Sequence, residues 1–223
     1  MKIWLLAAST ALALCACSPA APPQGASTEA NLGEAQAASP QPPKLQAVPG
    51  ANWDVQLPAS SIGFSGLHAG NAFSGRFERF NASVRFDPAD LAQAKAVVVI
   101  ETASARTGSK LQESSLTESD WFDVAKFPLA MFESDRFSQV SPGNFVMEGR
   151  LIIKGVATPV RLPFQLAQSG QSATAKGRVE LDRLALKIGV SSDASAEWVS
   201  AKIPLEIVLV ANARPASGPP AAQ

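Results

Sequence analysis

Residues 145–166 read FVMEGRLIIKGVATPVRLPFQL, and this stretch decides the fold class. Apolar or small residues take every second position on both sides of a Lys154-Gly155 turn signal: Phe145, Met147, Gly149, Leu151 and Ile153 before it, and Val160, Leu162, Phe164 and Leu166 after it. A period of two is that of a β-strand with one buried face. The stretch therefore predicts two successive strands separated by a turn.

The same alternation continues outward in both directions along the chain. It covers parts of residues 53–57, 62–86, 179–181 and 203–209, and turn signals with proline lie at 87–90 and 141–144. About eight strands at this spacing predict a β-sandwich or a β-barrel.

Two segments depart from this alternation. Ala96 to Ile100 is apolar at every position, which predicts a strand covered on both faces. Ser109 to Ser119 carries Leu111 and Leu116 among polar residues, and predicts a short, mostly exposed helix.

The residues expected inside the domain leave barrel and sandwich open. The chain has 11 Phe and no Tyr. Small residues share the alternating faces with the aromatic ones: Gly75, Ala82, Gly149, Ala175 and Gly177. Such a mixture suits a narrow apolar tunnel inside an eight-stranded barrel, and it suits ordinary close packing equally well.

Residues 1–16 are predicted to be a lipoprotein signal peptide. Lys2 precedes an apolar run from Ile3 to Leu14, which is shorter than the ~20 residues of a membrane span. Leu14, Cys15 and Ala16 before Cys17 resemble the lipobox of bacterial lipoproteins, so Cys17 is expected to be lipidated. Ser18 in place of Asp predicts sorting to the outer membrane. Cleavage without lipidation, giving a soluble periplasmic or secreted protein, is the alternative.

Composition divides the remainder of the chain into three parts. Residues 17–50 are rich in Pro, Ala, Gln and Ser, and predict a disordered tether behind the lipidated Cys17. Residues 51–213 hold the alternating runs and predict one β domain. Residues 214–223 predict a disordered tail.

Charge and residue counts exclude several classes of function. The chain has 19 basic and 19 acidic residues, so it lacks the excess positive charge of proteins that bind nucleic acid. Both cysteines, Cys15 and Cys17, lie in or directly behind the signal peptide, which leaves the domain without a disulfide or a thiol nucleophile. With one His as well, no metal site and no cofactor are expected.

The residues that could carry chemistry fit simpler roles. His68 could act as a general base, but the sequence offers it no recognisable nucleophile or orienting partner. Glu118, Asp120 and Asp123 form an acidic cluster whose spacing is not that of an EF-hand loop. We expect these carboxylates to make hydrogen bonds at a helix end and in turns.

Several blocks of sequence resemble the YceI family of polyisoprenoid-binding, lipocalin-like periplasmic proteins. The resemblance runs in order through these stretches: 60–64, 68–70, 73–77, 81–88, 107–108 with Leu111 and Leu116, 119–123, 127–128, 132–134, and 149–156 with Pro159-Val160. Residues 181–189 keep Arg183 but lack the Asp-Phe-Gly that many members carry. The resemblance implies an all-β fold, an eight-stranded antiparallel lipocalin-like β-barrel with a short helical insertion, and a long isoprenoid ligand in an apolar cavity.

The resemblance also implies which residues would contact that ligand. Nine apolar residues are expected to line the cavity: Phe64, Phe73, Phe77, Trp121, Phe122, Phe132, Leu151, Ile153 and Leu186. Seven of the nine are core candidates under any fold as well, whereas Trp121 and Phe122 could instead plug one barrel end. His68, Arg76, Arg183 and Trp198 are expected near the cavity mouth, with surface salt bridges as the alternative for the arginines.

These expectations combine into a hypothesis of binding without catalysis. The chain would store or transport an isoprenoid quinone or polyprenyl lipid in the periplasm, anchored to a membrane through its N-terminal lipid, and a homodimer is left open. A second hypothesis is an envelope stress or interaction protein whose barrel is filled by its own side chains. A third, ranked last, is an enzyme that acts on a lipid head group.

Overall fold

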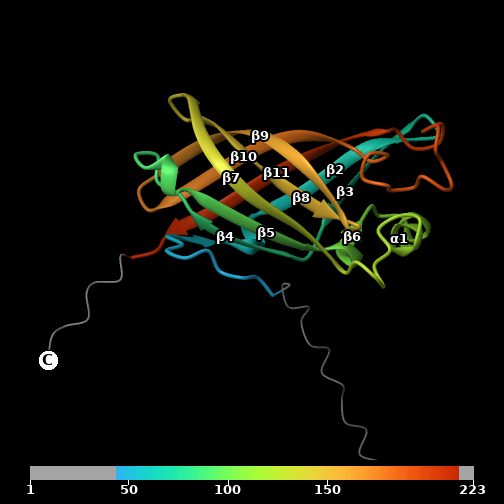
Figure 1. The fold of residues 1–223 in the computed structure, drawn as a ribbon, viewed down its shortest axis with the longest axis horizontal. Helices are drawn as coiled ribbons and strands as arrows, with labels where there is room; N and C mark the ends of the chain where they lie inside the picture. The colour runs from blue at the N-terminus through green and yellow to red at the C-terminus, as the bar shows by residue number, and fades with distance from the viewer. Residues whose placement is uncertain (1–43, 216–223) are drawn as a thin grey trace, which may run out of the picture. The chain divides into compact units, whose positions relative to one another are not determined.

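The computed structural model describes residues 44–215, and these fold into an antiparallel β-barrel (Figure 1). The strands are β1 (Trp53–Val55), β2 (Ser61–His68), β3 (Asn71–Phe77), β4 (Phe80–Arg85), β5 (Lys95–Glu101), β6 (Ala105–Arg106), β7 (Leu129–Ser141), β8 (Asn144–Ile153), β9 (Val156–Ser169), β10 (Ser172–Asp182) and β11 (Lys202–Ala213). The helix α1 spans Lys110–Thr117, and 3-10 turns lie at Leu57–Ala59, Leu91–Gln93 and Thr102–Ser104.

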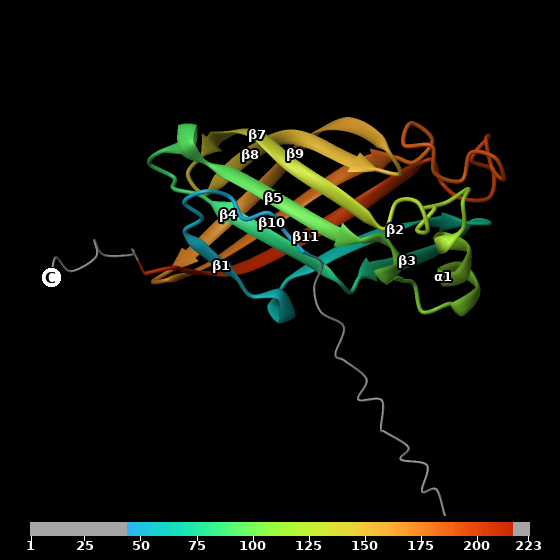
Figure 2. The same cartoon turned by 60° about the horizontal axis from the view of Figure 1, so that its bottom comes forward.

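Eight of these strands close into a ring. Their order is β1-β4-β5-β7-β8-β9-β10-β11, and β1 pairs with both β4 and β11 to complete the circle. Figure 2 shows the antiparallel strands β4 and β5 side by side, with β5 running toward the end of the barrel that carries α1. The predicted eight-stranded antiparallel barrel with a short helical insertion is confirmed, and the sandwich is excluded.

The first two strands share one edge of β11. Beyond the 3-10 turn, β2 pairs with Leu205–Val208, while β1 pairs with Ala211–Ala213. Ser60 joins the two halves, because its hydroxyl donates to the Gln56 carbonyl and accepts from the Val210 amide. Strands β3 and β6 then extend the sheet from β2.

The stretch at 145–166 forms the hairpin of β8 and β9. Ile153 pairs with Val156, so Lys154 and Gly155 are the two loop residues. Both have positive φ, 50° and 74°, as the two-residue turn that matches the twist of antiparallel strands requires. Glycine supplies one of these conformations without steric cost.

A cluster of aromatic rings lies at the barrel end opposite α1. Phe86 lies 5.3 Å from Phe145 and 5.4 Å from Phe137 between ring centroids, and Phe145 stacks on Phe164 at 5.5 Å. Trp53 packs in the same cluster, and its indole N–H donates to the Phe86 carbonyl at 2.9 Å. Offset and edge-to-face pairs of this kind make this end a packed core.

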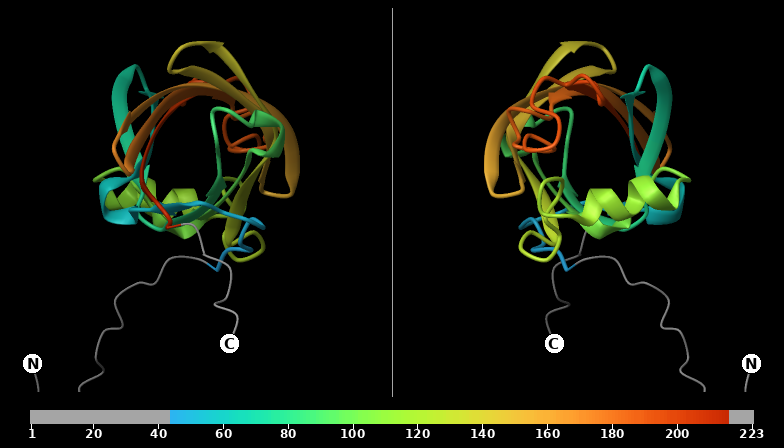
Figure 3. Two further views of the ribbon diagram at one scale, coloured as in Figure 1. Left: turned by 90° about the vertical axis from the view of Figure 1, so that its left-hand side faces the viewer. Right: turned by 90° about the vertical axis from the view of Figure 1, so that its right-hand side faces the viewer.

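The other end carries α1 and an irregular segment, residues 183–201, which we call the capping loop. Figure 3 looks onto this end in its right-hand view, with α1 running across the lower edge of the ring. Every residue of α1 stays at least partly exposed, as predicted for a surface helix. Within residues 44–215, none of the helices has the length and apolar character needed to cross a membrane.

The packed domain begins earlier than the predicted boundary at residue 51. Val48 is buried, and its amide donates to the buried Ser83 hydroxyl at 2.9 Å. A lone Val among Pro and Ala gives no periodic signal, which is why composition assigned it to the tether. The predicted signal peptide 1–16, Cys17 and most of the predicted tether and tail lie outside the described residues.

Candidate binding cavity

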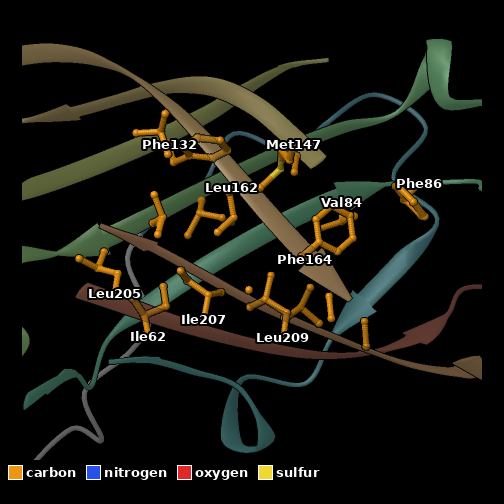
Figure 4. Close-up of a pocket in the computed structure, with 18 of the residues that line it drawn as sticks. Ile62, Val84, Phe86, Phe132, Met147, Leu162, Phe164, Leu205, Ile207 and Leu209 are labelled. Atoms are coloured by element: carbon orange, nitrogen blue, oxygen red, sulfur yellow. The ribbon is translucent and has the colours of Figure 1, made fainter. Parts of the chain in front are cut away.

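The middle of the barrel encloses an apolar cavity of about 160 Å³. Its wall consists of apolar side chains and a glycine, contributed by inward positions of nearly every strand in the ring. Figure 4 shows Ile62, Phe132, Met147, Leu162 and Ile207 around this space, together with further labelled residues. Period-two alternation explains the wall, because every second residue of each strand must face the lumen.

A second cavity of about 300 Å³ lies toward α1. Ile100, Leu151, Leu181 and Leu205 line both cavities, so the two spaces lie end to end along the lumen. A buried water needs only about 10–15 Å³ of such space. The lumen therefore has room for an elongated ligand rather than for isolated solvent molecules.

The nine residues expected to line a cavity all face one of these spaces. Phe132 borders the central cavity, Leu151 borders both, and the other seven border the cavity near α1: Phe64, Phe73, Phe77, Trp121, Phe122, Ile153 and Leu186. Three rings form a chain along its wall, with centroids 5.3 Å apart for Phe64 and Phe77 and 6.0 Å for Phe77 and Phe122. That these side chains contact a ligand stays a prediction.

The four residues expected at the mouth take different places. His68 borders the cavity near α1 and is exposed. Arg76 and Trp198 lie outside the wall of both cavities that the described residues form. Arg76 is an exposed side chain 3.8 Å from the Glu78 carboxylate, which matches its alternative assignment as a surface salt bridge.

Arg183 is neither a surface salt bridge nor a free group at the mouth, because it is only 3% exposed. Its guanidinium lies 2.6 Å from the Asp193 carboxylate, inside the capping loop. It also donates to the carbonyls of Val199 at 2.7 Å and Ile188 at 2.9 Å, and it lies 5.8 Å from the Trp121 ring centre. The alternation of β10 ends before Arg183, so sequence periodicity could not predict this burial.

Asp193 organises the other side of the same loop. Its carboxylate accepts the backbone amides of Glu197 at 2.9 Å and Val199 at 2.8 Å in addition to the Arg183 guanidinium. Burial alone would raise the pKa of Asp193, but these backbone amides and the positive charge of Arg183 lower it below the usual value. The ion pair thus holds the capping loop in one conformation beside the cavity.

Asp120 ties the segment after α1 to the capping loop. Its carboxylate accepts the amides of Ser191 and Ser192, both at 2.9 Å, and the Ser192 hydroxyl at 2.6 Å. Burial would raise the pKa of Asp120, but these hydrogen bonds lower it to about 2. Among residues 44–215, the structure contains no group of three His, Cys, Asp or Glu side chains that could hold a metal ion.

Sequence reasoning missed two parts of the wall. In the first, α1 contributes four residues to the cavity beside it: Leu111, Gln112, Ser115 and Leu116. Their spacing, two adjacent pairs one turn apart, marks one helix face and could have found them. The second missed part consists of Met147, Leu162 and Phe164, which line the central cavity. On the two strands of the β8–β9 hairpin, these residues lie on the same face of the sheet as Leu151.

A closed eight-stranded antiparallel barrel around an apolar lumen defines a lipocalin-like β-barrel protein. The family model for a YceI-like domain matches residues 53–211, which is most of the chain. The protein therefore belongs to the YceI-like family.

Two bacterial proteins are similar to the chain in sequence. A UPF0312 protein of Shewanella denitrificans is 32% identical over 119 residues, which span 53% of this chain and 62% of that protein. UPF0312 protein VC_A0539 of Vibrio cholerae is 25% identical over 158 residues, which span 69% of this chain and 84% of that protein.

Two solved structures share the fold. The crystal structure of Burkholderia cenocepacia BcnA has 30% sequence identity and a TM-score of 0.68, with 70% of this chain and 99% of that chain covered. A polyisoprenoid binding domain from Saccharophagus degradans has 16% identity and a TM-score of 0.56, with 73% and 99% covered. At 16% identity, the similarity to this second structure is one of fold alone.

Proposed function

We propose that the protein binds an isoprenoid lipid, a quinone or polyprenyl chain, in its barrel and performs no chemistry on it. The central cavity carries this proposal, because all of its wall is apolar and it continues into the cavity beside α1. Burial of an apolar chain contributes ~25 cal/mol per Å² removed from water. Such contacts are not directional, so the proposed site discriminates weakly among chain lengths.

The relatives support the same class of ligand. The chain belongs to the YceI-like family, and a protein of the same fold is described as a polyisoprenoid binding domain. The sequence blocks that resemble the family include residues now found at the cavity, among them Phe77, Trp121 and Leu151. The proposal therefore specifies the isoprenoid chain as the ligand class and does not specify a head group.

In this proposal, the protein is a periplasmic carrier or storage protein that is held at a membrane by a lipid anchor. Cys17 and the apolar run from Ile3 to Leu14 support export and lipidation. The absence of Asp after Cys17 supports the outer membrane as the destination. Mass spectrometry of the purified chain tests this part: a diacylglyceryl group on an N-terminal Cys17 supports it, and an unmodified mature N-terminus contradicts it.

Two observations favour lipid binding over the two alternative functions, an enzyme and an interaction protein with a filled barrel. The Asp120 carboxylate already accepts three hydrogen bonds from the capping loop, so it is not a free carboxylate that could assist His68 in catalysis. The two cavities disfavour the alternative of an envelope interaction protein whose own side chains fill the lumen.

Lipid analysis of the natively purified protein tests the proposed ligand. The protein is purified without harsh detergent, extracted with organic solvent, and the extract is analysed by mass spectrometry. We expect a prenyl lipid in near-stoichiometric amount, and uptake of a quinone by protein stripped of lipid. Repeated absence of prenyl lipid together with failure to take up quinone would contradict the proposal.

A further inference from the structure

Several large apolar side chains are exposed around the α1 end of the barrel, and three of them lie on β2, on α1 and in the capping loop. Leu67 at the end of β2 is 49% exposed, Leu111 on α1 is 79% exposed, and Trp198 in the capping loop is 58% exposed. We call these three residues the apolar rim. A lone exposed apolar residue needs no explanation, whereas a group at one opening does.

Contacts and shared walls place the rim at the mouth of the lumen. The Ser200 amide donates to the Leu67 carbonyl at 3.0 Å and the Ala69 amide to the Trp198 carbonyl at 2.7 Å, so β2 and the capping loop adjoin here. Their chain neighbours His68 and Val199 pair with each other and line the cavity near α1. Leu111 borders the same cavity from the helix.

The rim side chains are left exposed for a geometric reason. His68 and Val199 point into the cavity, and alternation along an extended chain directs Leu67 and Trp198 the opposite way. The far end of the barrel differs, because aromatic rings pack it and Val140 is its large exposed apolar side chain. The exposed apolar surface therefore surrounds the end of the lumen opposite the aromatic cluster.

We propose that the apolar rim docks on the surface of a lipid bilayer, so that the cavity mouth meets the membrane. This inference rests on the proposed function, because an isoprenoid cargo resides in the membrane and would otherwise cross water to reach the lumen. Trp with Leu is the residue mixture that enters the interfacial layer of a bilayer, where an indole has both apolar and polar surroundings.

The chain outside the described residues permits this orientation. The 26 residues from Ser18 to Pro43 precede the barrel, and at full extension they reach about 90 Å. The longest strand, β9, has 14 residues and spans about 48 Å at most. An anchor at Cys17 therefore leaves either end of the barrel free to reach the bilayer, and the rim selects the α1 end.

Charges near the rim balance one another. Lys110 directly precedes Leu111, and Glu197 directly precedes Trp198, so the charged chain neighbours of the rim carry opposite signs. The attraction is therefore apolar rather than electrostatic, and docking should weaken little between low and high salt.

Quenching of tryptophan fluorescence measures docking directly. The full chain is mixed with excess vesicles of phosphatidylethanolamine and phosphatidylglycerol that contain a doxyl-labelled phosphatidylcholine. The contribution of Trp198 is the difference between the wild-type chain and W198F. We expect the doxyl lipid to quench this difference signal at both low and high salt.

Matched substitutions identify the docking end. L67E places a charge on the rim, away from the cavity wall, and should lower both the Trp198 quenching and the rate of quinone uptake from vesicles roughly tenfold. Uptake of quinone from detergent micelles should keep its wild-type rate in L67E. V140E places the same charge on the opposite end and should behave as wild type in all three assays.

The outcomes separate docking from lipid binding. Equal Trp198 quenching in wild type, L67E and V140E overturns the docking proposal, even if every variant binds quinone. Protection of Trp198 from iodide in vesicle-free protein also overturns it, because a second copy of the chain would then cover the rim. Absence of quinone binding in all variants overturns the proposed function, while rim-specific quenching would still support docking.

Discussion

At the residue scale, the buried pair of Arg183 and Asp193 holds the capping loop beside the cavity. An isolated charge in such surroundings is costly, and here the guanidinium donates to carbonyls while the carboxylate accepts backbone amides. This network explains why a stretch of 19 residues between β10 and β11 needs few regular elements. Removal of either partner leaves the other charge buried without compensation.

We therefore expect D193N to lower the free energy of unfolding by about 3–5 kcal/mol. The control is E206Q, because Glu206 pairs with Arg178 at 3.5 Å with both side chains mostly exposed, and its loss should cost under about 1 kcal/mol. Urea unfolding followed by circular dichroism measures both. Equal effects of D193N and E206Q would refute the structural role assigned to the buried pair.

The carboxylate of Asp120 gives a second prediction, on pH dependence. Its pKa is lowered to about 2 in the folded protein, so its stabilising contribution is complete above the unfolded value near 4 and is lost as the pH falls to 2. D120N should cost roughly 1 kcal/mol at pH 7, after allowance for partial exposure. The difference in unfolding free energy between wild type and D120N should shrink steadily from pH 5 to pH 2, and a constant difference over that range would contradict this assignment.

At the element scale, the tight pairing of β7 with β8 depends on a glycine. Gly149 pairs with Ser134, where β7 has a register shift before Arg136. A side chain at Gly149 would collide with the Glu133 carbonyl and with the Phe132 ring. Ser134 is completely buried on the other side, and its hydroxyl accepts the Ala96 amide at 2.8 Å, which joins β5 to the same point.

G149A should accordingly destabilise the barrel by about 1–3 kcal/mol, because the added methyl group displaces packed backbone. G63A is the matched control: Gly63 also lies in a strand, and the nearest atom to an added methyl is 3.5 Å away. Thermal unfolding of both variants checks this prediction. A larger loss in G63A than in G149A would show that the β7–β8 contact is not the constraint described here.

Strands and hairpins were the elements that the sequence predicted best, and the reason is physical. Each inward residue of β8 and β9 repeats with period two, so the hairpin and the lumen-facing residues can be predicted from apolar pattern alone. The junction between β1 and β2 at Ser60 and the packing of Val48 depend on hydrogen bonds to residues far away in the chain. The burial of Arg183 depends on a hydrogen-bond network within the irregular capping loop. Such contacts leave no periodic trace in the sequence.

At the scale of the whole molecule, the barrel has two unlike ends. One carries the clustered rings of Phe86, Phe145 and Phe164, and the other is bordered by α1 and the capping loop. Between them the two cavities form a lumen whose central part is entirely apolar. In the proposed function, an apolar chain enters from the α1 end and extends toward the aromatic cluster.

A quinone-binding titration on a pair of variants tests this central claim most directly. Ala175 on β10 lines the central cavity, whereas the next residue, Lys176, is exposed on the outside of the barrel. A175W should fill part of the lumen and weaken binding of a long-tailed quinone at least tenfold while the barrel stays folded by circular dichroism, and K176W should bind as wild type. Equal binding by both variants would contradict the claim that the lumen holds the lipid chain.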